Sequence, residues 1–262
     1  EFSDPVYKEI ALANGAINRM NREELRAKCT ELKLDTRGVN DVLRKRFKSY
    51  YKKQKLMHSP AAEGISVMYF DYICVVDFEA TCEENNPPDY LHEIIEFPMV
   101  LIDTHTLEIV DSFQEYVKPV LHPQLSEFCV KLTGITQARF NKLCIYWDMG
   151  KFLHTQCKLS RIRYPQFARK WINIRKSYGN FYKVPRTQTK LICMLENLGM
   201  EYDGRPHCGL DDSRNIARIA IHMLKDGCQL RVNECLHSGE PRSVPISAPI
   251  EGAPAPQPPK KR

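Results

Sequence analysis

The sequence predicts an α/β or α+β domain over residues 68–238, behind a small helical unit. In the first half of that region the apolar runs are short and bounded by turn residues, which is the pattern of strands. In the second half, apolar residues recur at spacings of three and four, which is the pattern of amphipathic helices. Strands followed by helices indicate this fold class, and 262 residues with 43% hydrophobic side chains suffice for a real core.

The N-terminal sequence predicts two helices joined by a turn, the second of them strongly basic. Residues 21–34 form the first helix, because Asn21 is a favourable N-cap and apolar residues recur along one stripe. The Asp-Thr-Arg-Gly stretch at 35–38 predicts the turn, and the second helix follows from Val39. By periodicity alone, such a pair could contact nucleic acid or dock a protein. The candidate nucleic-acid contacts are cations of the second helix: Arg44, Lys45, Arg46, Lys48 and Lys52.

Three strands and four helices are expected after residue 68. The strands are predicted at 72–77, 96–103 and 108–116, with a hairpin turn at 103–106. The helices are predicted at 123–132, 161–178, 187–198 and 213–225. Residues 56–67 are a predicted linker, and the Pro-rich residues 239–262 are a predicted disordered tail.

Charge is divided unevenly along the chain. Residues 61–138 hold fourteen acidic and two basic side chains, whereas residues 139–190 hold thirteen basic side chains and a single acid, Asp148. Grouped acids can hold cations, and a basic surface can hold a polyanion. Such runs are often only solvated faces, but the second block is basic enough to favour a nucleic-acid surface.

Membrane insertion and secretion are not indicated. No apolar run approaches the roughly 18 residues of a membrane span, and no signal peptide is visible. Because the chain begins with Glu1 rather than Met, we expect it to be a fragment. The ten cysteines lie singly, without a CxxC pair, which favours free thiols of a reducing cytosol or nucleus over disulfides or zinc.

Two carboxylates, Asp77 and Glu79, end the apolar run at 72–76. In a strand, side chains two residues apart point to the same face, so both acids project together. Adjacent buried anions are costly without a partner, and hard divalent cations such as Mg²⁺ or Mn²⁺ prefer carboxylate oxygens. The alternative is an exposed strand end with solvated acids.

Three further residues extend this pair. His207 precedes Asp212 by five residues, and Asp212 lies at the start of an amphipathic helix, where it could simply cap the helix. A histidine close to an acid is a candidate general base, although a lone loop histidine is more often a surface residue. Asp148 follows the apolar run 143–147, which fits either a ligand at a strand end or an ordinary turn residue.

Asp77, Glu79, Asp148, His207 and Asp212, in this order, resemble the site of the DEDDh class of 3′-to-5′ exonucleases. That resemblance implies a ribonuclease H-like domain, with helices around a mixed sheet. Residues 14–55 are similar to a SAP nucleic-acid-binding domain. The whole arrangement resembles the SAP-containing histone-mRNA exoribonucleases of the enhanced-RNA-interference type, on these stretches: DFEATCE, HEIIEFP, LTGIT, WINIRKSYG and RPHCGLDDSRNIA.

The resemblance implies a two-metal mechanism that releases nucleoside 5′-monophosphates. Two Mg²⁺ ions, with Mn²⁺ as a substitute, would be held by Asp77, Glu79, Asp148 and Asp212. Glu79 and His207 would be the catalytic residues, with His207 deprotonating the attacking water. Glu79, Ala80 and His207 would contact the terminal nucleotide.

The resemblance also implies substrates, partners and a location. The substrates are RNA 3′ ends: histone mRNA stem-loops, small interfering RNA overhangs and ribosomal RNA. These connect the chain to histone mRNA decay, RNA-mediated gene silencing and rRNA processing. The partners are the histone stem-loop-binding protein and ribosomes, without a membrane, and the location is the cytoplasm and nucleus, including the nucleolus.

One stretch departs from the pattern of the class. Between Thr136 and Asp148 the class places a helix and the strand that carries the third acid, and a crossover between parallel strands takes a dozen or more residues. Roughly 30 residues are therefore expected to be missing near 137–147. We expect weaker activity and an uncovered apolar sheet face. The alternatives are a catalytically weak stem-loop RNA-binding protein and, less well supported, a DNA-binding scaffold.

Overall fold

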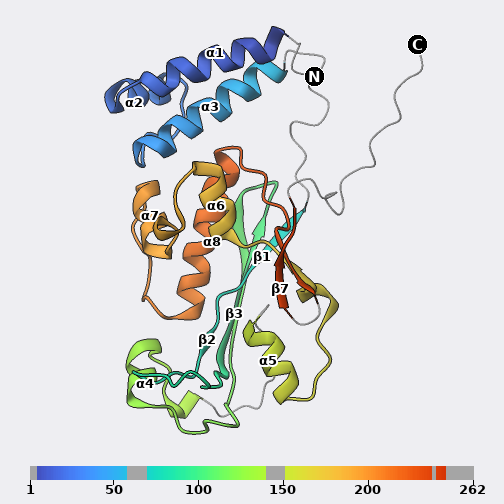
Figure 1. The fold of residues 1–262 in the computed structure, drawn as a ribbon. Helices are drawn as coiled ribbons and strands as arrows, with labels where there is room; N and C mark the ends of the chain where they lie inside the picture. The colour runs from blue at the N-terminus through green and yellow to red at the C-terminus, as the bar shows by residue number, and fades with distance from the viewer. Residues whose placement is uncertain (1–4, 58–69, 140–150, 238–239, 246–262) are drawn as a thin grey trace, which may run out of the picture.

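The N-terminal helical unit consists of three helices in the part of the chain that the computed structural model describes, residues 5–57, 70–139, 151–237 and 240–245. These are α1 (Pro5–Arg19), α2 (Arg22–Glu31) and α3 (Asn40–Met57), which lie together at one end of the molecule (Figure 1). The predicted N-cap is confirmed, because the Asn21 side chain accepts a hydrogen bond from the Glu24 backbone N–H. Five buried side chains form the core of this unit: Ile17, Leu25, Cys29, Leu43 and Phe47.

The structure corrects the boundaries predicted for this unit. Helix α1 starts at Pro5, ahead of the predicted domain start at residue 14. It belongs to the helical unit because the side chains of Ile10 and Ile17 are buried. The predicted linker begins inside a helix, since α3 continues to Met57. The rest of that linker lies outside the described residues.

An antiparallel sheet follows. It consists of β1 (Tyr72–Val75), β2 (Glu79–Ala80), β3 (Ile94–Asp103) and β4 (Glu108–Tyr116), and every pairing among the described residues is antiparallel. β1 and β2 both pair with β3, and β4 pairs with its other edge. The first predicted strand therefore ends at Val75, short of Asp77. The strands predicted at 96–103 and 108–116 are confirmed, the first with two extra residues.

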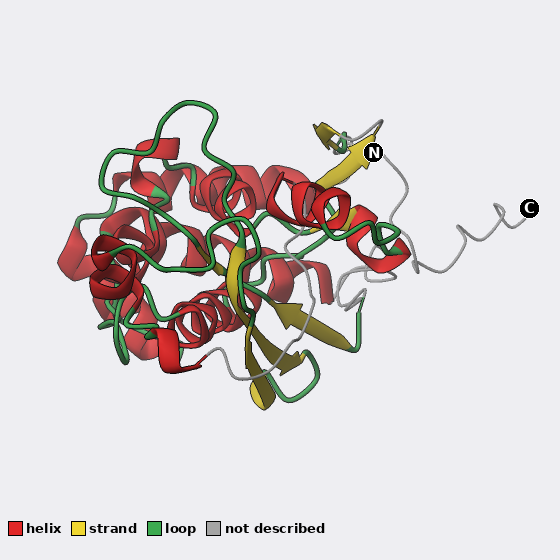
Figure 2. Cartoon of the chain, turned by 90° about the horizontal axis from the view of Figure 1, so that it is seen from below, coloured by secondary structure: helices red, strands yellow, loops and turns green. Residues whose placement is uncertain are grey.

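One face of this sheet is covered by α8 (Gly209–Lys225), and α7 (Leu191–Leu198) packs against α8. Val100 and Ile102 point to this face and are fully buried against the apolar side of α8. Figure 2 shows that helices gather on one side of the strands. The helix predicted at 213–225 therefore exists, but it begins four residues earlier, at Gly209. The helix predicted at 187–198 starts at Leu191 and ends at Leu198 as expected, with Gly199 in the left-handed conformation.

The opposite face is only partly covered. Phe97 packs near α5 (Lys151–Leu159), whose Leu153 and Cys157 are buried. Farther along the same face, the Tyr72 side chain is 56% exposed and the Phe113 side chain is 43% exposed. Within the described residues, Tyr72 and Phe113 are therefore partly open to solvent on this face, and the uncovered face expected from a shortened chain stays a prediction.

Two elements differ from the expected ones in the second half of the chain. The helix predicted at 161–178 is wrong: a 3₁₀ turn (Gln166–Arg169) and strand β5 (Lys170–Trp171) precede α6 (Ile174–Tyr182). Pro165 disfavours a helix before it, and the Asn173 side chain starts α6 by accepting from the Lys176 backbone. The predicted helix at 123–132 is observed as α4 (Glu127–Thr133).

The predicted tail also begins too early. Strand β6 (Glu234–His237) pairs with β7 (Glu240–Ser243), so residues 240–243 belong to a second small sheet with β5. Residues 246–262 lie outside the described part of the chain. No helix of the described residues is long and apolar enough to cross a membrane.

Candidate active site

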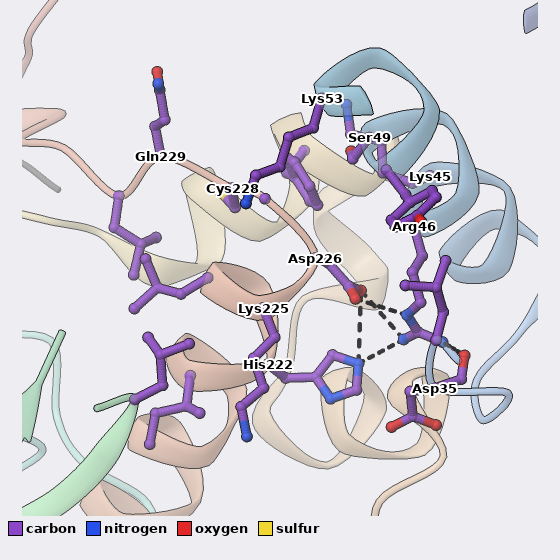
Figure 3. Close-up of a pocket in the computed structure, with 18 of the residues that line it drawn as sticks. Asp35, Lys45, Arg46, Ser49, Lys53, His222, Lys225, Asp226, Cys228 and Gln229 are labelled. Atoms are coloured by element: carbon purple, nitrogen blue, oxygen red, sulfur yellow. Dashed lines mark hydrogen bonds and ion pairs between the residues drawn. The ribbon is translucent and has the colours of Figure 1, made fainter. Parts of the chain in front are cut away.

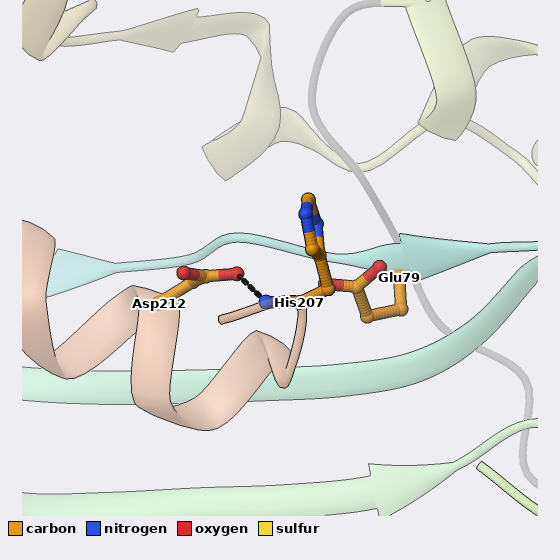
Figure 4. A group of neighbouring side chains, drawn as sticks. All are labelled: Glu79, His207 and Asp212. Carbon is orange, nitrogen blue, oxygen red and sulfur yellow. Dashed lines mark hydrogen bonds between the residues drawn. The ribbon is translucent and has the colours of Figure 1, made fainter. Parts of the chain in front are cut away.

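Glu79, His207 and Asp212 come together where β2, the loop 203–208 and the start of α8 meet (Figure 4). One ligand atom from each of the three lies within 4.8 Å of the others, which is close enough for a shared metal ion. Glu79 is more than 120 positions away from His207 and Asp212 in the sequence. The fold therefore brings together three of the five predicted site residues.

Asp212 is held in place through both carboxylate oxygens. The Tyr202 hydroxyl donates to Oδ1 at 2.7 Å, and the His207 backbone N–H donates to Oδ2 at 3.0 Å. Only 8% of Asp212 is exposed, and the residue sits in the first turn of α8. Its carboxylate thus does more than cap a helix, because it connects the helix to the loop that carries His207.

Glu96 is a buried acid that the sequence reading did not place in the site. Its carboxylate accepts from the backbone N–H groups of Gly209 at 3.0 Å and Leu210 at 3.2 Å, at the N-terminus of α8. A side chain at Gly209 would not fit, because its Cβ would lie 2.7 Å from the Asp77 carbonyl oxygen. Glu96 therefore fixes the start of α8 against the strand pair that carries the acids. The sequence indicates this role only weakly: Glu96 is an acid in a predicted strand, in alternation with the apolar residues Val100 and Ile102.

The carboxylates share an electrostatically unfavourable environment. Burial, reinforced by the charges of Asp77, Asp212 and Glu96, raises the pKa of Glu79 to about 9. Burial and the charges of Asp212 and Glu96 raise the pKa of Asp77 to about 7, and burial also raises the pKa of Asp212. Buried carboxylates this close together are stable only if they bind protons or a cation. Their raised pKa values therefore fit the prediction that these acids hold a metal ion.

The donor set fits a divalent metal ion. Carboxylate oxygens are the preferred ligands of hard cations, and imidazole nitrogen adds a donor at the same place. Asp77 belongs to this acidic group by its electrostatic effect on Glu79, although it is not one of the three residues within 4.8 Å. Asp148 lies outside the described residues, as does the predicted strand 143–147.

His207 is positioned for proton transfer. Its backbone is in the left-handed region, with φ of 63°, which is unfavourable for a residue with a Cβ. The side chain is exposed, and Figure 4 shows its imidazole projecting away from α8 beside Glu79. A solvent-accessible imidazole beside an acid is a candidate general base, and this role of His207 stays a prediction.

A groove of about 1430 Å³ separates α3 from the C-terminal part of α8 and the hairpin β3–β4 (Figure 3). Lys45 and Lys52 line it, as two of the predicted RNA contacts. The Lys45 ammonium lies 4.4 Å from the centre of the Phe181 ring. Burial, with a smaller effect from the nearby charge of Lys183, lowers the pKa of Lys45.

The prediction of Arg46 as an RNA contact is wrong for this arrangement. Arg46 is 3% exposed, and its guanidinium donates to Asp226 Oδ1 at 2.6 Å (Figure 3). It also bonds to His222 and to the backbone carbonyl oxygens of Asp35 and Arg37. Arg46 therefore joins the N-terminal helical unit to the C-terminal end of α8. Of the other predicted contacts, Arg44 pairs with Asp41, and Lys48 donates to Asn18.

Comparison with known proteins identifies the class of this fold and site. A family model described as "Exonuclease" matches residues 74–143, which include Asp77 and Glu79. A solved nuclease domain of 3′hExo, described as a DEDDh family member bound to rAMP, is 59% identical with a TM-score of 0.62. It covers 65% of this chain and 100% of that chain. The ribonuclease H-like fold class is confirmed, and the chain is a divalent-metal-dependent DEDDh exonuclease.

Full-length comparisons define the family. The human 3′-5′ exoribonuclease 1 is 60% identical over 100% of this chain and 83% of that protein, and the rat protein is 61% identical over 100% and 84%. A structure titled "3′-end specific recognition of histone mRNA stem-loop by 3′-exonuclease" is 59% identical, covers 98% of both chains and has a TM-score of 0.68. The chain belongs to the 3′-5′ exoribonuclease 1 family, and it is a 3′-to-5′ exoribonuclease.

Proposed function

We propose that this chain trims the 3′ ends of structured RNA, with histone mRNA stem-loops as the leading substrate and Mg²⁺ as the metal. The observation that carries this proposal is the meeting of Glu79, His207 and Asp212 within 4.8 Å. The stem-loop is supported by the similarity to a structure whose title names that RNA. Small interfering RNA overhangs and ribosomal RNA ends are further substrates of the same chemistry.

Each site residue has a separate role in the proposed hydrolysis. Asp77, Glu79 and Asp212, with Asp148 as the fourth acid, would hold two Mg²⁺ ions, for which Mn²⁺ could substitute. When bound, the metals stabilise negative charge on the attacking and leaving oxygens of the phosphodiester. The exposed imidazole of His207 accepts the proton of the attacking water. The terminal nucleotide is contacted by Glu79, by the backbone around Ala80 and by His207.

We also infer that residues 14–55 are a SAP-type module that holds the RNA stem. Lys45 and Lys52 contact phosphates from the groove, and Lys48 and Arg44 extend this basic surface along α3. Arg46 is left out, because its guanidinium is committed to Asp226. The predicted protein partners, the histone stem-loop-binding protein and ribosomes, and the location in cytoplasm, nucleus and nucleolus remain predictions.

The test is the release of nucleoside 5′-monophosphates from a stem-loop RNA labelled at its 3′ end. Wild-type chain with Mg²⁺ releases label, and EDTA or Asp77→Asn stops the release. Glu84→Gln, an exposed acid close in sequence, is the matched control and leaves the rate unchanged. RNA binding without release, unaffected by EDTA, would contradict the proposed activity.

One observation favours the second candidate, a catalytically weak RNA-binding protein. The alignment with the human relative extends over 291 positions, whereas this chain has 262 residues, so about 29 positions have no residue of this chain. This supports the predicted loss of roughly 30 residues. A shortened connection to Asp148 reduces the rate if that acid is displaced, since small displacements at such sites are costly. The same release assay distinguishes the two candidates.

A further inference from the structure

The loop 203–208 carries His207 in a conformation that needs support. Gly204 and His207 both have positive φ, 90° and 63°, and such a backbone is unfavourable for His207, which has a Cβ. Hydrogen bonds to α8 and within the loop hold this backbone in place. The Arg205 N–H donates to Asp211 Oδ2 and the His207 N–H donates to Asp212 Oδ2, both at 3.0 Å. The Arg205 carbonyl oxygen accepts from the Cys208 N–H within the loop.

The side chain of Arg205 leaves this loop and reaches a different helix. Its guanidinium donates to three backbone carbonyl oxygens at the C-terminal end of α4: Lys131 at 3.0 Å, Leu132 at 3.3 Å and Thr133 at 3.3 Å. Those carbonyls have no partner within the helix and carry the negative end of its dipole, so a guanidinium is a favourable cap. Gly134 makes room for it, because a Cβ there would lie 1.3 Å from Arg205 Nη1.

The other end of α4 touches the strand of the acids. The Ser126 hydroxyl, which caps α4, also donates to the Cys82 carbonyl oxygen at 2.7 Å. The Cys129 thiol, one turn into the helix, lies 3.8 Å from the Ala80 carbonyl oxygen. Ala80 directly follows Glu79. Helix α4 is therefore fixed at one end to the segment after Glu79 and at the other end to the loop of His207.

We propose that Arg205 is a positioning residue of the nuclease site: through α4, it sets the placement of the His207 imidazole relative to the Glu79 carboxylate. This inference rests on the proposed function, because it assigns His207 and Glu79 their roles there. Arg205 acts through the backbone of its loop and touches neither reacting group.

The enzymatic test compares Arg205→Ala and Arg205→Lys with Lys131→Ala. Lys131→Ala is the matched control, because it removes an exposed cation from the same helix end and keeps the carbonyl. For Arg205→Ala, kcat on stem-loop RNA in Mg²⁺ falls about 10-fold to 100-fold, while KM changes less than about 2-fold. Arg205→Lys recovers part of kcat, since an ammonium can cap fewer carbonyls. Unchanged kcat in Arg205→Ala would overturn the proposal.

A double-mutant cycle tests whether α4 transmits the effect. Ser126→Ala removes the contact at the far end of the helix, and its effect on kcat is expected to be non-additive with that of Arg205→Ala. Strict additivity would contradict the role of α4 as a connection.

Hydrogen–deuterium exchange tests the same idea without catalysis. The amides of residues 204–208 exchange faster in Arg205→Ala than in wild type, whereas in Lys131→Ala they do not. Equal exchange in all three proteins would overturn the proposal even if the wild-type chain were inactive. A wild-type chain that releases no monophosphate would instead contradict the proposed function, so the two failures are distinguishable.

Discussion

The two faces of the sheet formed by β1, β2, β3 and β4 differ in how they are covered. Val100 and Ile102 are fully buried under α8, whereas Tyr72 and Phe113, on the opposite face, are 56% and 43% exposed. Glu96 points to the covered face, where it bonds to the N-terminus of α8. Glu79 lies opposite Glu96 in the strand pairing. The site is therefore built on the covered face of the sheet, at the N-terminus of α8.

The largest expected effect concerns the site itself. Glu79→Gln removes a carboxylate from the group that holds the metal, and the release of monophosphates falls roughly 10³-fold, since a bound metal contributes several kcal/mol to the transition state. The same substitution stabilises the metal-free protein, because it removes a buried acid from like charges. Thermal unfolding in EDTA and the release assay measure the two effects. If Glu79→Gln were less stable than wild type in EDTA, burial and the neighbouring acids would not destabilise the ionised Glu79 carboxylate as we infer.

The second prediction compares the two faces directly. Ile102→Ala creates a cavity under α8 and lowers the free energy of unfolding by about 2–5 kcal/mol. Phe113→Ala lowers it by less than about 1.5 kcal/mol, because much of that side chain is already in contact with solvent. Denaturant unfolding of both variants is the measurement. Equal losses would mean that the face of Phe113 is covered in solution.

The third prediction concerns pH. The folded, metal-free protein keeps a proton on Glu79 up to a pKa of about 9, whereas the unfolded chain releases that proton near the ordinary pKa of glutamate. The native state then binds more protons than the unfolded state, so stability falls as pH rises between about 5 and 9. Mg²⁺ reverses this trend because it replaces the protons. Midpoints of unfolding at pH 6 and 8.5, with EDTA and with Mg²⁺, check the sign, and Glu79→Gln should weaken the pH dependence.

The smallest expected effect concerns the sheet face that carries Tyr72 and Phe113. Phe113→Lys places a charge in the apolar area, which reduces self-association at high protein concentration and leaves the rate of RNA cleavage within about 2-fold. Ile192→Lys, an exposed apolar residue of α7, is the control and leaves self-association unchanged. Sedimentation at several concentrations measures this. Identical behaviour of both variants would show that this face has no special tendency to associate.

Local sequence patterns were sufficient for most elements. The spacing of apolar residues placed α2, α3, β3, α7 and most of α8, because each has a regular buried stripe or face. Strand β4 was also placed, although none of its residues is fully buried. The order of acids and the histidine in the chain placed Glu79, His207 and Asp212 in one site. The helix predicted at 161–178 failed where Pro165 and the pairing of β5 with β6 outweighed local helical pattern.

Roles that depend on distant contacts were not accessible from the sequence. Arg46 looked like one more cation on a basic helix, yet it pairs with Asp226, 180 positions away. The roles of Glu96 and Arg205 also depend on elements far along the chain, since Arg205 reaches carbonyl oxygens more than 70 positions away. Periodicity reports which face of an element is buried, and it does not report which partner covers that face.

The most direct test of the account is the rate at which this chain degrades a 3′-labelled histone stem-loop RNA in Mg²⁺. It is compared with a version into which the positions missing relative to the human protein are restored. The account predicts measurable release that EDTA abolishes, at a rate about 10-fold to 100-fold below that of the restored version. No release by either protein would contradict the assignment of the site. Equal rates would contradict the claim that the shortened segment weakens it.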